Sequence, residues 1–174
     1  MARIHSFAPI ARRDAKVLIL GSVPGVKSLE AEEYYAHPRN AFWDIFGALC
    51  GATRALRYAA RLERLQDAGI AVWDVLHSAE REGSLDSAIR HAIPNDLAGL
   101  LEGCPEIEVI ALNGSYASAT FKRYARSTLK AKLRVVTLPS TSPANARSSL
   151  AKKLEVWRDP LEPVLLRSGL LRDA

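Results

Sequence analysis

Four short apolar runs, alternating with stretches of helical spacing, constrain the fold of this chain more than any other feature. They occupy residues 17–20, 70–76, 109–112 and 134–138. A continuous apolar run of this length is typical of a strand covered on both faces, and strands that alternate with helices favour a parallel sheet. The chain has 174 residues, 48% of them apolar, which is enough for one well-buried core. We therefore predict a single domain over residues 1–174, an α/β three-layer sandwich with a central four-stranded parallel sheet flanked by helices.

The segments between and around these runs show less regular spacing of apolar residues. Residues 1–15 are expected to form a surface arm, and residues 77–94 a polar connection whose length makes it a candidate for a functional loop. Asn95 suits the N-cap of the helix that follows it. The last helix, from about residue 149, contains Pro160 and Pro163, which are expected to break or bend it. Its inward-facing residues are expected to be Leu150, Leu154, Trp157 and Leu161.

The carboxyl ends of parallel strands meet at one edge of a sheet, and open α/β sheets bind ligands there. Each predicted strand is followed at that edge by a distinctive loop or residue pair. These are GSVPG at 21–25, Trp73-Asp74, Asn113-Gly114-Ser115 and PSTSP at 139–143. We expect the four to line a single crevice.

The charge of the chain favours an anionic partner. The formal net charge is +5 and the pI is about 9.4, values that are common among nucleic-acid-binding proteins but not specific to them. Residues 122–134, KRYARSTLKAKLR, hold six basic and no acidic residues. Such a run is often only a solvated face, but its closeness in sequence to the loop at 139–143 suggests a role beside the crevice.

Cysteine count and hydropathy indicate a cellular setting. Cys50 and Cys104 are too few for a disulfide framework or a zinc site, which fits a reducing cytoplasm. The sequence has no apolar run of signal-peptide or membrane-spanning length. We expect a soluble, cytoplasmic protein that does not associate with membranes.

The stretch GSVPGVKS superficially resembles a phosphate-binding P-loop. A P-loop needs a lysine directly after its last glycine, whereas Val26 separates Gly25 from Lys27. Nucleoside triphosphate hydrolysis is therefore disfavoured. Either this is an ordinary tight turn, or its small residues leave backbone N–H groups accessible to a ligand.

Aromatic and amide side chains follow. Tyr34 and Tyr35 are expected in a loop, where an aromatic ring can stack on a flat ligand, although Tyr34 is expected to cover the core instead. In His37-Pro38-Arg39-Asn40, the asparagine could cap the next helix, take part in chemistry, or do both. Asn113 could equally be a turn residue favoured beside glycine.

Taken together, GSVPG, YYAHPRNAFW, Trp73-Asp74, Asn113-Gly114 and LPSTSPAN, in this order at the ends of successive strands, resemble the uracil-DNA glycosylase superfamily. The match is closest to its hypoxanthine-DNA (deoxyinosine) glycosylase branch and covers about residues 4–165. The resemblance implies an enzyme of base excision repair that flips a deaminated base, hypoxanthine first, out of double-stranded DNA and hydrolyses its N-glycosidic bond. It implies no metal and no cofactor, and we expect a monomer.

The resemblance also assigns roles to residues. Asn40 would orient the attacking water, because Val23 stands where other branches carry a water-activating Asp or Asn. Ser140 stands where uracil enzymes have a histidine, and Ala144 where they have an intercalating leucine, so efficient uracil excision is not expected. Catalytic residues would be Asn40 and Ser140; base-binding residues Gly21, Ser22, Val23, Tyr35, Asp74 and Asn113; and DNA-binding residues Ser142, Pro143, Asn145 and Arg147. Tyr35 would stack on the base, Asp74 or Asn113 would read its edge, and Asn145 or Arg147 would fill the gap that it leaves.

Three alternatives stay open. One is a uracil or G:U/T mismatch-specific DNA glycosylase. Another is an N-glycosidic hydrolase of free nucleosides or nucleotides, which would not need a basic surface. The last is a DNA-binding module with weakened catalysis, since Val23 cannot activate water.

Overall fold

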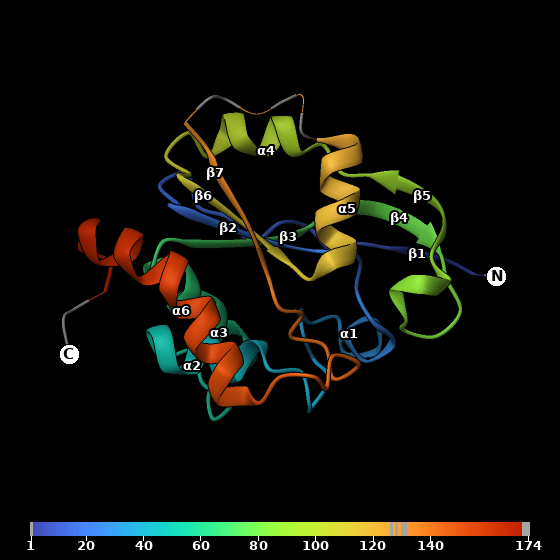
Figure 1. Cartoon of the computed structure of the whole chain (residues 1–174), viewed down its shortest axis with the longest axis horizontal. Helices are drawn as coiled ribbons and strands as arrows, with labels where there is room; N and C mark the ends of the chain where they lie inside the picture. The colour runs from blue at the N-terminus through green and yellow to red at the C-terminus, as the bar shows by residue number, and fades with distance from the viewer. Residues whose placement is uncertain (1, 126, 128, 130–131, 172–174) are drawn as a thin grey trace.

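The central sheet of the molecule has four parallel strands. The structure, a computed structural model, describes residues 2–125, 127, 129 and 132–171 (Figure 1). The sheet order is β3 (Ile70–Asp74), β2 (Val17–Gly21), β6 (Val109–Asn113) and β7 (Arg134–Leu138). All three pairings are parallel. The predicted fold class and its four strands are confirmed.

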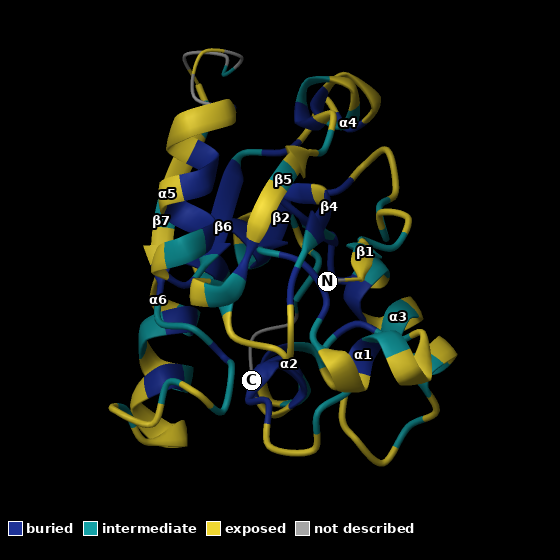
Figure 2. Cartoon of the chain, turned by 90° about the vertical axis from the view of Figure 1, so that its right-hand side faces the viewer, coloured by how far each residue is buried: buried dark blue, intermediate teal, exposed yellow. Residues whose placement is uncertain are grey.

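Strand β2 explains why a continuous apolar run was required. Its five residues are all buried, and successive side chains point to opposite faces of the sheet. Val17 and Ile19 join one core cluster, whereas Leu18 and Leu20 join another. Figure 2 shows β2 and β6 in the colour of buried residues between the flanking layers.

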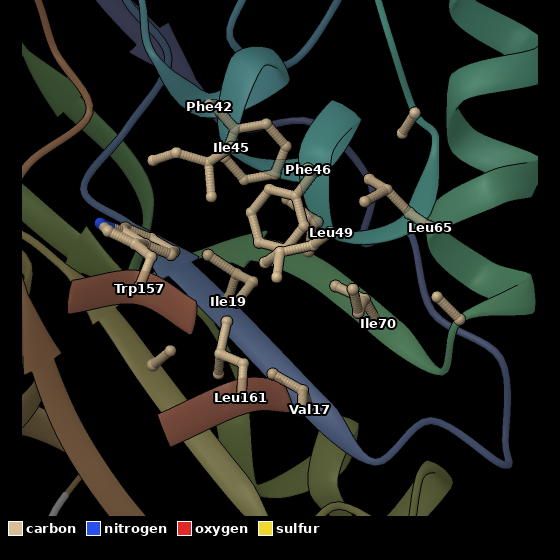
Figure 3. Packing of buried hydrophobic residues seen from close by; sticks show 14 of the residues in the cluster. Val17, Ile19, Phe42, Ile45, Phe46, Leu49, Leu65, Ile70, Trp157 and Leu161 are labelled. Carbon is tan, nitrogen blue, oxygen red and sulfur yellow. The ribbon is translucent and has the colours of Figure 1, made fainter. Parts of the chain in front are cut away.

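Helices cover both faces. One face packs against α2 (Phe42–Cys50), α3 (Tyr58–Asp67) and α6 (Leu150–Arg167), and the other against α4 (Leu97–Gly103) and α5 (Ser115–Tyr124). Figure 3 shows Phe46 and Trp157 packed over Ile19, and their rings meet edge to face with centroids 5.9 Å apart. These aromatic contacts fix α2 and α6 against β2 and thereby place the loops at the carboxyl edge.

A second, antiparallel sheet corrects two expectations. It consists of β1 (Arg3–His5), β4 (Leu76–Glu80) and β5 (Arg90–Pro94), in the order β1-β4-β5. Residues 1–15 are therefore not merely a surface arm, and residues 77–94 are not one long loop. Strand β5 could not be recognised from its residues, because it is largely exposed, as its yellow ribbon in Figure 2 shows, and has no alternating apolar residues. The remaining short elements are α1 (Val26–Ala31) and η1 (Asp86–Ala88).

The expectation that Asn95 caps α4 was also wrong. The N-cap of α4 is Asp96, whose carboxylate accepts from the Gly99 amide at 3.0 Å. Asn95 instead donates its side-chain N–H groups to the carbonyls of Asp74 and Leu76, at 2.9 and 3.0 Å. The side chain thus joins the end of β3 to the start of β4.

Helix α6 is not broken by its prolines, and its first turn faces differently from expectation. It continues through Pro160 and Pro163, because the buried packing of Trp157 and Leu161 outweighs the lost backbone hydrogen bonds. Leu150 is 49% exposed rather than inward-facing, since the buried position of the first turn belongs to Lys153. No helix within the described residues is long and apolar enough to cross a bilayer.

Candidate active site

A cleft of about 890 Å³ lies at the carboxyl edge of the parallel sheet. Its lining includes residues of α1 and of the loop after β7, two segments that Figure 1 draws in blue and in orange. The loops after β2, β6 and β7 and the end of β3 contribute to it, as the parallel topology required. It brings together every residue singled out from the sequence: Gly21, Ser22, Val23, Tyr35, Asn40, Asp74, Asn113, Ser140, Ser142, Pro143, Asn145 and Arg147.

The floor of the cleft is formed where β2 and β3 end side by side. Their register places Gly21 beside Asp74. A Cβ atom on Gly21 would lie 2.7 Å from Asp74 Oδ1 and 3.1 Å from the Tyr35 hydroxyl. Any side chain at this position would displace the carboxyl group. Glycine is therefore needed here for close approach, and its backbone conformation has no part in the requirement.

Asp74 is 4% exposed and accepts a hydrogen bond from the Ser6 hydroxyl at 2.9 Å. Burial, reinforced by the Asp86 carboxylate, raises the pKa of Asp74 to about 7, although Ser6 and Arg81 act in the opposite direction. A substantial share of this carboxyl is therefore protonated near neutral pH. In that form it can both donate and accept a hydrogen bond.

A second acidic group supports the turn at 21–25. Asp86 accepts from the Ser22 hydroxyl at 2.7 Å, and burial raises the pKa of Asp86. Nearby, the buried Arg81 donates to the carbonyls of Gly83 and Pro24, at 2.8 and 2.5 Å. The sequence did not single out Arg81 or Asp86. The one signal that could have done so was the unusual length of the polar connection that contains them.

Tyr35 brings its hydroxyl close to Gly21, at the floor of the cleft. Its φ of 55° is in the left-handed region, and its ring stacks on Phe42 with centroids 3.9 Å apart and planes 10° apart. Burial raises the pKa of the Tyr35 hydroxyl, so this group stays protonated. Because Phe42 covers one ring face, only the other face can stack on a ligand. Tyr34, by contrast, is buried in the core as expected.

Asn40 is held in place by two hydrogen bonds, one to its side chain from the start of α2 and one to its backbone carbonyl from Arg54. Its Oδ1 accepts from the Phe42 amide at 3.0 Å, and its carbonyl accepts from the Arg54 guanidinium. The N-cap of α2 is Ala41, so Asn40 makes an Asx turn just before the helix and is not the cap itself. No hydrogen bond joins its Nδ2 to any residue that the structure describes. The amide N–H groups are therefore available in the cleft.

Asn113, in contrast, is fully engaged as a donor. Its Nδ2 donates to Thr141 Oγ1 at 2.9 Å and to the Tyr35 hydroxyl at 3.3 Å, and its Oδ1 accepts from the Thr141 amide at 2.9 Å. Thr141 in turn accepts from the Ala41 amide at 2.9 Å. Asn113 thus fastens the end of β6 to the loop after β7 and to the start of α2.

The loop at 139–147, hereafter the β7 loop, forms the outer part of the cleft. Ser140 accepts from the Ser142 amide at 3.2 Å, which leaves its O–H free to donate. The Asn145 side chain donates to the Ser140 carbonyl at 3.1 Å, and the backbone carbonyl of Asn145 accepts from Lys153 Nζ at 2.8 Å. Its side chain is therefore turned onto its own loop. Arg147 is exposed and free of ion pairs with any described residue.

The basic segment 122–134 does not contribute to the cleft, contrary to expectation. Arg126 and Lys130 lie outside the described residues, and none of the described members of the segment lines the cleft. The reason is topological. Helix α5 leads away from the cleft and β7 leads back to it, so the end of α5 and the start of β7 lie at the amino edge of the sheet. Within the described chain, no cluster of three or more metal-ligating side chains occurs.

Comparison with known proteins agrees with this geometry. Residues 8–160 match the family model of the uracil DNA glycosylase superfamily. A hypoxanthine DNA glycosylase of Methanosarcina barkeri is 33% identical over 151 residues, which are 86% of this chain and 92% of the relative. One of Methanosarcina acetivorans is 33% identical over 87% of this chain and 94% of the relative.

A solved structure gives the same assignment. It is a solution NMR structure of a protein from Methanosarcina acetivorans, described as a candidate uracil DNA glycosylase. It superimposes with a TM-score of 0.76 at 32% identity, covering 92% of this chain and 99% of the other. Sequence, topology and the composition of the cleft converge on one family. The chain belongs to the uracil DNA glycosylase superfamily.

Proposed function

We propose that this chain is a monofunctional DNA glycosylase that extrudes hypoxanthine from double-stranded DNA and hydrolyses its N-glycosidic bond. One observation carries the proposal: the cleft combines a fixed asparagine amide, a carboxyl of raised pKa and an aromatic ring. The relatives named hypoxanthine DNA glycosylase match most of the chain and add support. We further propose that the protein acts as a monomer in the cytoplasm.

Asn40 is proposed to position the attacking water. An amide is a poor base, but cleavage of the N-glycosidic bond runs ahead of attack in an oxocarbenium-like transition state, so the water need not be deprotonated first. As the C–N bond breaks, the water oxygen bonds to the sugar carbon and the released proton passes to the departing base. The Asx turn and the Arg54 contact immobilise the asparagine, so that the second lone pair of its Oδ1 can accept a hydrogen bond from the water in a fixed direction. Preorganisation of this kind is the main contribution that an amide can make.

Asp74 is proposed to read the base. Hypoxanthine presents a ring N–H donor next to a carbonyl acceptor, and a protonated carboxyl matches this pair with its own acceptor and donor. Asn113 is a poorer reader, because its N–H groups already donate to Thr141 and Tyr35. We therefore assign Asn113 to positioning. Selection of damaged sites would come largely from extrusion, which is least costly at mispaired bases.

The departing base develops negative charge and needs donors. Ser140 has a free O–H in the cleft, and the backbone at Gly21–Val23 lies beside the carboxyl that holds the base. Tyr35 offers its uncovered ring face for stacking. These groups would stabilise the leaving base without a metal ion.

Lys27 bears on whether the enzyme would also cleave the strand. A lysine that forms a Schiff base is usually desolvated so that its amine is neutral. Lys27 lines the cleft, but its Nζ is exposed and is ion-paired with Glu30 at 2.9 Å. This environment favours hydrolysis alone, which leaves an abasic site.

The test is base release from labelled duplexes that carry deoxyinosine, deoxyuridine or deoxyxanthosine opposite each normal base. Abasic sites are then cleaved with alkali and the fragments counted. We expect product from deoxyinosine with alkali and none without it. Wild-type protein that releases no base from any duplex would overturn the proposal. Release from free nucleosides but not from DNA would favour a nucleoside hydrolase.

Asn40→Ala tests the assignment of the water-positioning residue. We expect its rate of base release to fall by about 10²-fold or more, because one preorganised polar group is commonly worth this much. Asn40→Asp is the structural control, since it keeps the acceptor that the Phe42 amide requires. If both variants melt like the wild type and Asn40→Ala still releases the base at the normal rate, the assignment is wrong.

Uracil excision is the second candidate function, and a specific observation favours it. Uracil carries the same adjacent N–H and carbonyl groups that the Asp74 carboxyl would match. The deoxyuridine duplexes in the same assay decide between the two bases. A higher rate on deoxyuridine than on deoxyinosine would make this chain a uracil enzyme.

A further inference from the structure

A large apolar side chain, Leu85, is exposed at the rim of the cleft. Leu85 lines the cleft and yet is 59% exposed. Single exposed leucines are common on protein surfaces and need no explanation by themselves. What distinguishes Leu85 is the way in which its backbone is held.

The residues on either side of Leu85 are bound to the loop after β2. Ser84 Oγ accepts from the Val26 amide at 2.9 Å, and Asp86 accepts from the Ser22 hydroxyl at 2.7 Å. Beneath them, the buried Arg81 donates to the carbonyls of Gly83 and Pro24. The segment 81–86 is therefore fixed to the turn that forms the floor of the cleft. Leu85 is the one large apolar side chain in that fixed segment.

The strand order β3-β2-β6-β7 separates Leu85 from the β7 loop. The β7 loop is at one edge of this sheet, whereas the 81–86 segment is bound to the loop after β2, beyond β6. Both segments line the cleft, but one is attached to the loop after β2 and the other follows β7. The β7 loop itself, PSTSPANAR, contains no large aliphatic or aromatic side chain.

We propose that Leu85 inserts against the base stack next to the extruded nucleotide and so helps to hold the base in the cleft. This inference rests on the proposed function. Extruding a nucleotide leaves an unstacked step, and proteins commonly fill such steps with an apolar wedge such as leucine. A side chain that inserts into DNA has to be carried by a rigid backbone segment. The hydrogen bonds of Ser84, Asp86 and Arg81 give Leu85 that support.

The test compares Leu85→Ala with wild type on two substrates. We expect the rate of base release from a deoxyinosine duplex to fall about tenfold, since unstacking costs a few kcal/mol and the wedge offsets part of this. Release from the same oligonucleotide as a single strand should be unchanged, because there is no stacked pair to displace. Leu85→Met keeps an apolar side chain of similar size and should retain the duplex rate. Ile93→Ala is the matched control: Ile93 is 48% exposed but does not line the cleft.

A direct readout of unstacking is the fluorescence of 2-aminopurine placed beside deoxyinosine. Binding of wild type should raise it, and binding of Leu85→Ala should raise it less. Equal duplex rates and equal fluorescence for Leu85→Ala and wild type would overturn the wedge while the proposed function stands. Equal losses on duplex and single strand would also overturn it, because they would indicate a structural role. If wild type releases no base at all, the proposed function is overturned, and so is the wedge proposal that rests on it.

Discussion

The floor and the outer rim of the cleft differ in charge and in burial. The floor holds the buried Asp74 and, supporting its turn, the half-buried Asp86, two carboxyl groups whose pKa values are both raised. The β7 loop carries hydroxyl groups, the exposed Arg147, and Asn145, whose carbonyl is bound by the buried Lys153. A protonated carboxyl suits an uncharged base, whereas a cation at the rim suits the phosphates of DNA. The contrast supports the proposal that the floor recognises the base and the rim recognises the DNA backbone.

The largest expected effect comes from crowding the floor. Gly21→Ala places a Cβ atom 2.7 Å from Asp74 Oδ1, and the carboxyl must move. We expect a fall in base release of about 10²-fold, which is typical when a group shifts by about 1 Å. Gly25→Ala in the same turn is the control, because its Cβ would meet Ser84 Oγ at an ordinary 3.5 Å. Similar losses in both variants would show that the turn itself, rather than the carboxyl, had been disturbed.

A smaller effect should appear in the pH dependence of stability. The folded-state pKa of Asp74, about 7, is higher than the usual value of 3.8. Between those values the folded state keeps a proton that the unfolded state releases, so wild type loses stability as pH rises through this window. Asp74→Asn removes the effect. Its free energy of unfolding relative to wild type should rise by about 2 kcal/mol between pH 5.5 and 8.

Urea unfolding at both pH values measures this difference. Asp159→Asn, which changes an exposed carboxyl on α6, should give the same difference from wild type at both. If the Asp74→Asn difference is also independent of pH, the carboxyl is not held in its protonated form and the contrast between floor and rim is lost.

The smallest effect is expected at the rim. Arg147→Ala should weaken duplex binding about three- to tenfold, equally for all target bases, and should lower the slope of log K against log salt by about one. Binding titrations at several salt concentrations measure both quantities. Lys122→Ala, on the basic segment that does not line the cleft, is the control. An equal change in the two variants would mean that the rim has no special role in contacting DNA.

The central sheet could be predicted because each of its strands is marked by the residues of its own segment. Each buried parallel strand needs a continuous apolar run, and the runs at 17–20, 70–76, 109–112 and 134–138 are readable without knowledge of their neighbours. The same topology brought the predicted site residues into one cleft. Their roles stay predictions until the variants are measured.

The antiparallel sheet could not be predicted in this way. Strand β5 is held by backbone pairing with β4 and carries few buried side chains, so its sequence contains no periodic signal. Arg81 and Asp86 were missed for a related reason. Their importance depends on tertiary contacts with Pro24 and Ser22, and a polar segment does not reveal its distant partners. The prediction for the basic segment 122–134 was wrong because the segment precedes β7, whereas the cleft lies at the other end of that strand. Residues that are close in sequence are therefore separated here by the length of a strand.

The hydroxyl group that contacts the floor carboxyl belongs to Ser6, directly after β1. Residues at the very start of the chain therefore act on the protonation of Asp74, 68 positions later. An affinity tag fused upstream of Arg3 is only a few residues from this contact, and trimming the first six residues would delete both the strand and the hydroxyl. Preparations that differ only in their N-terminal extension should be compared before any pH profile of this enzyme is interpreted.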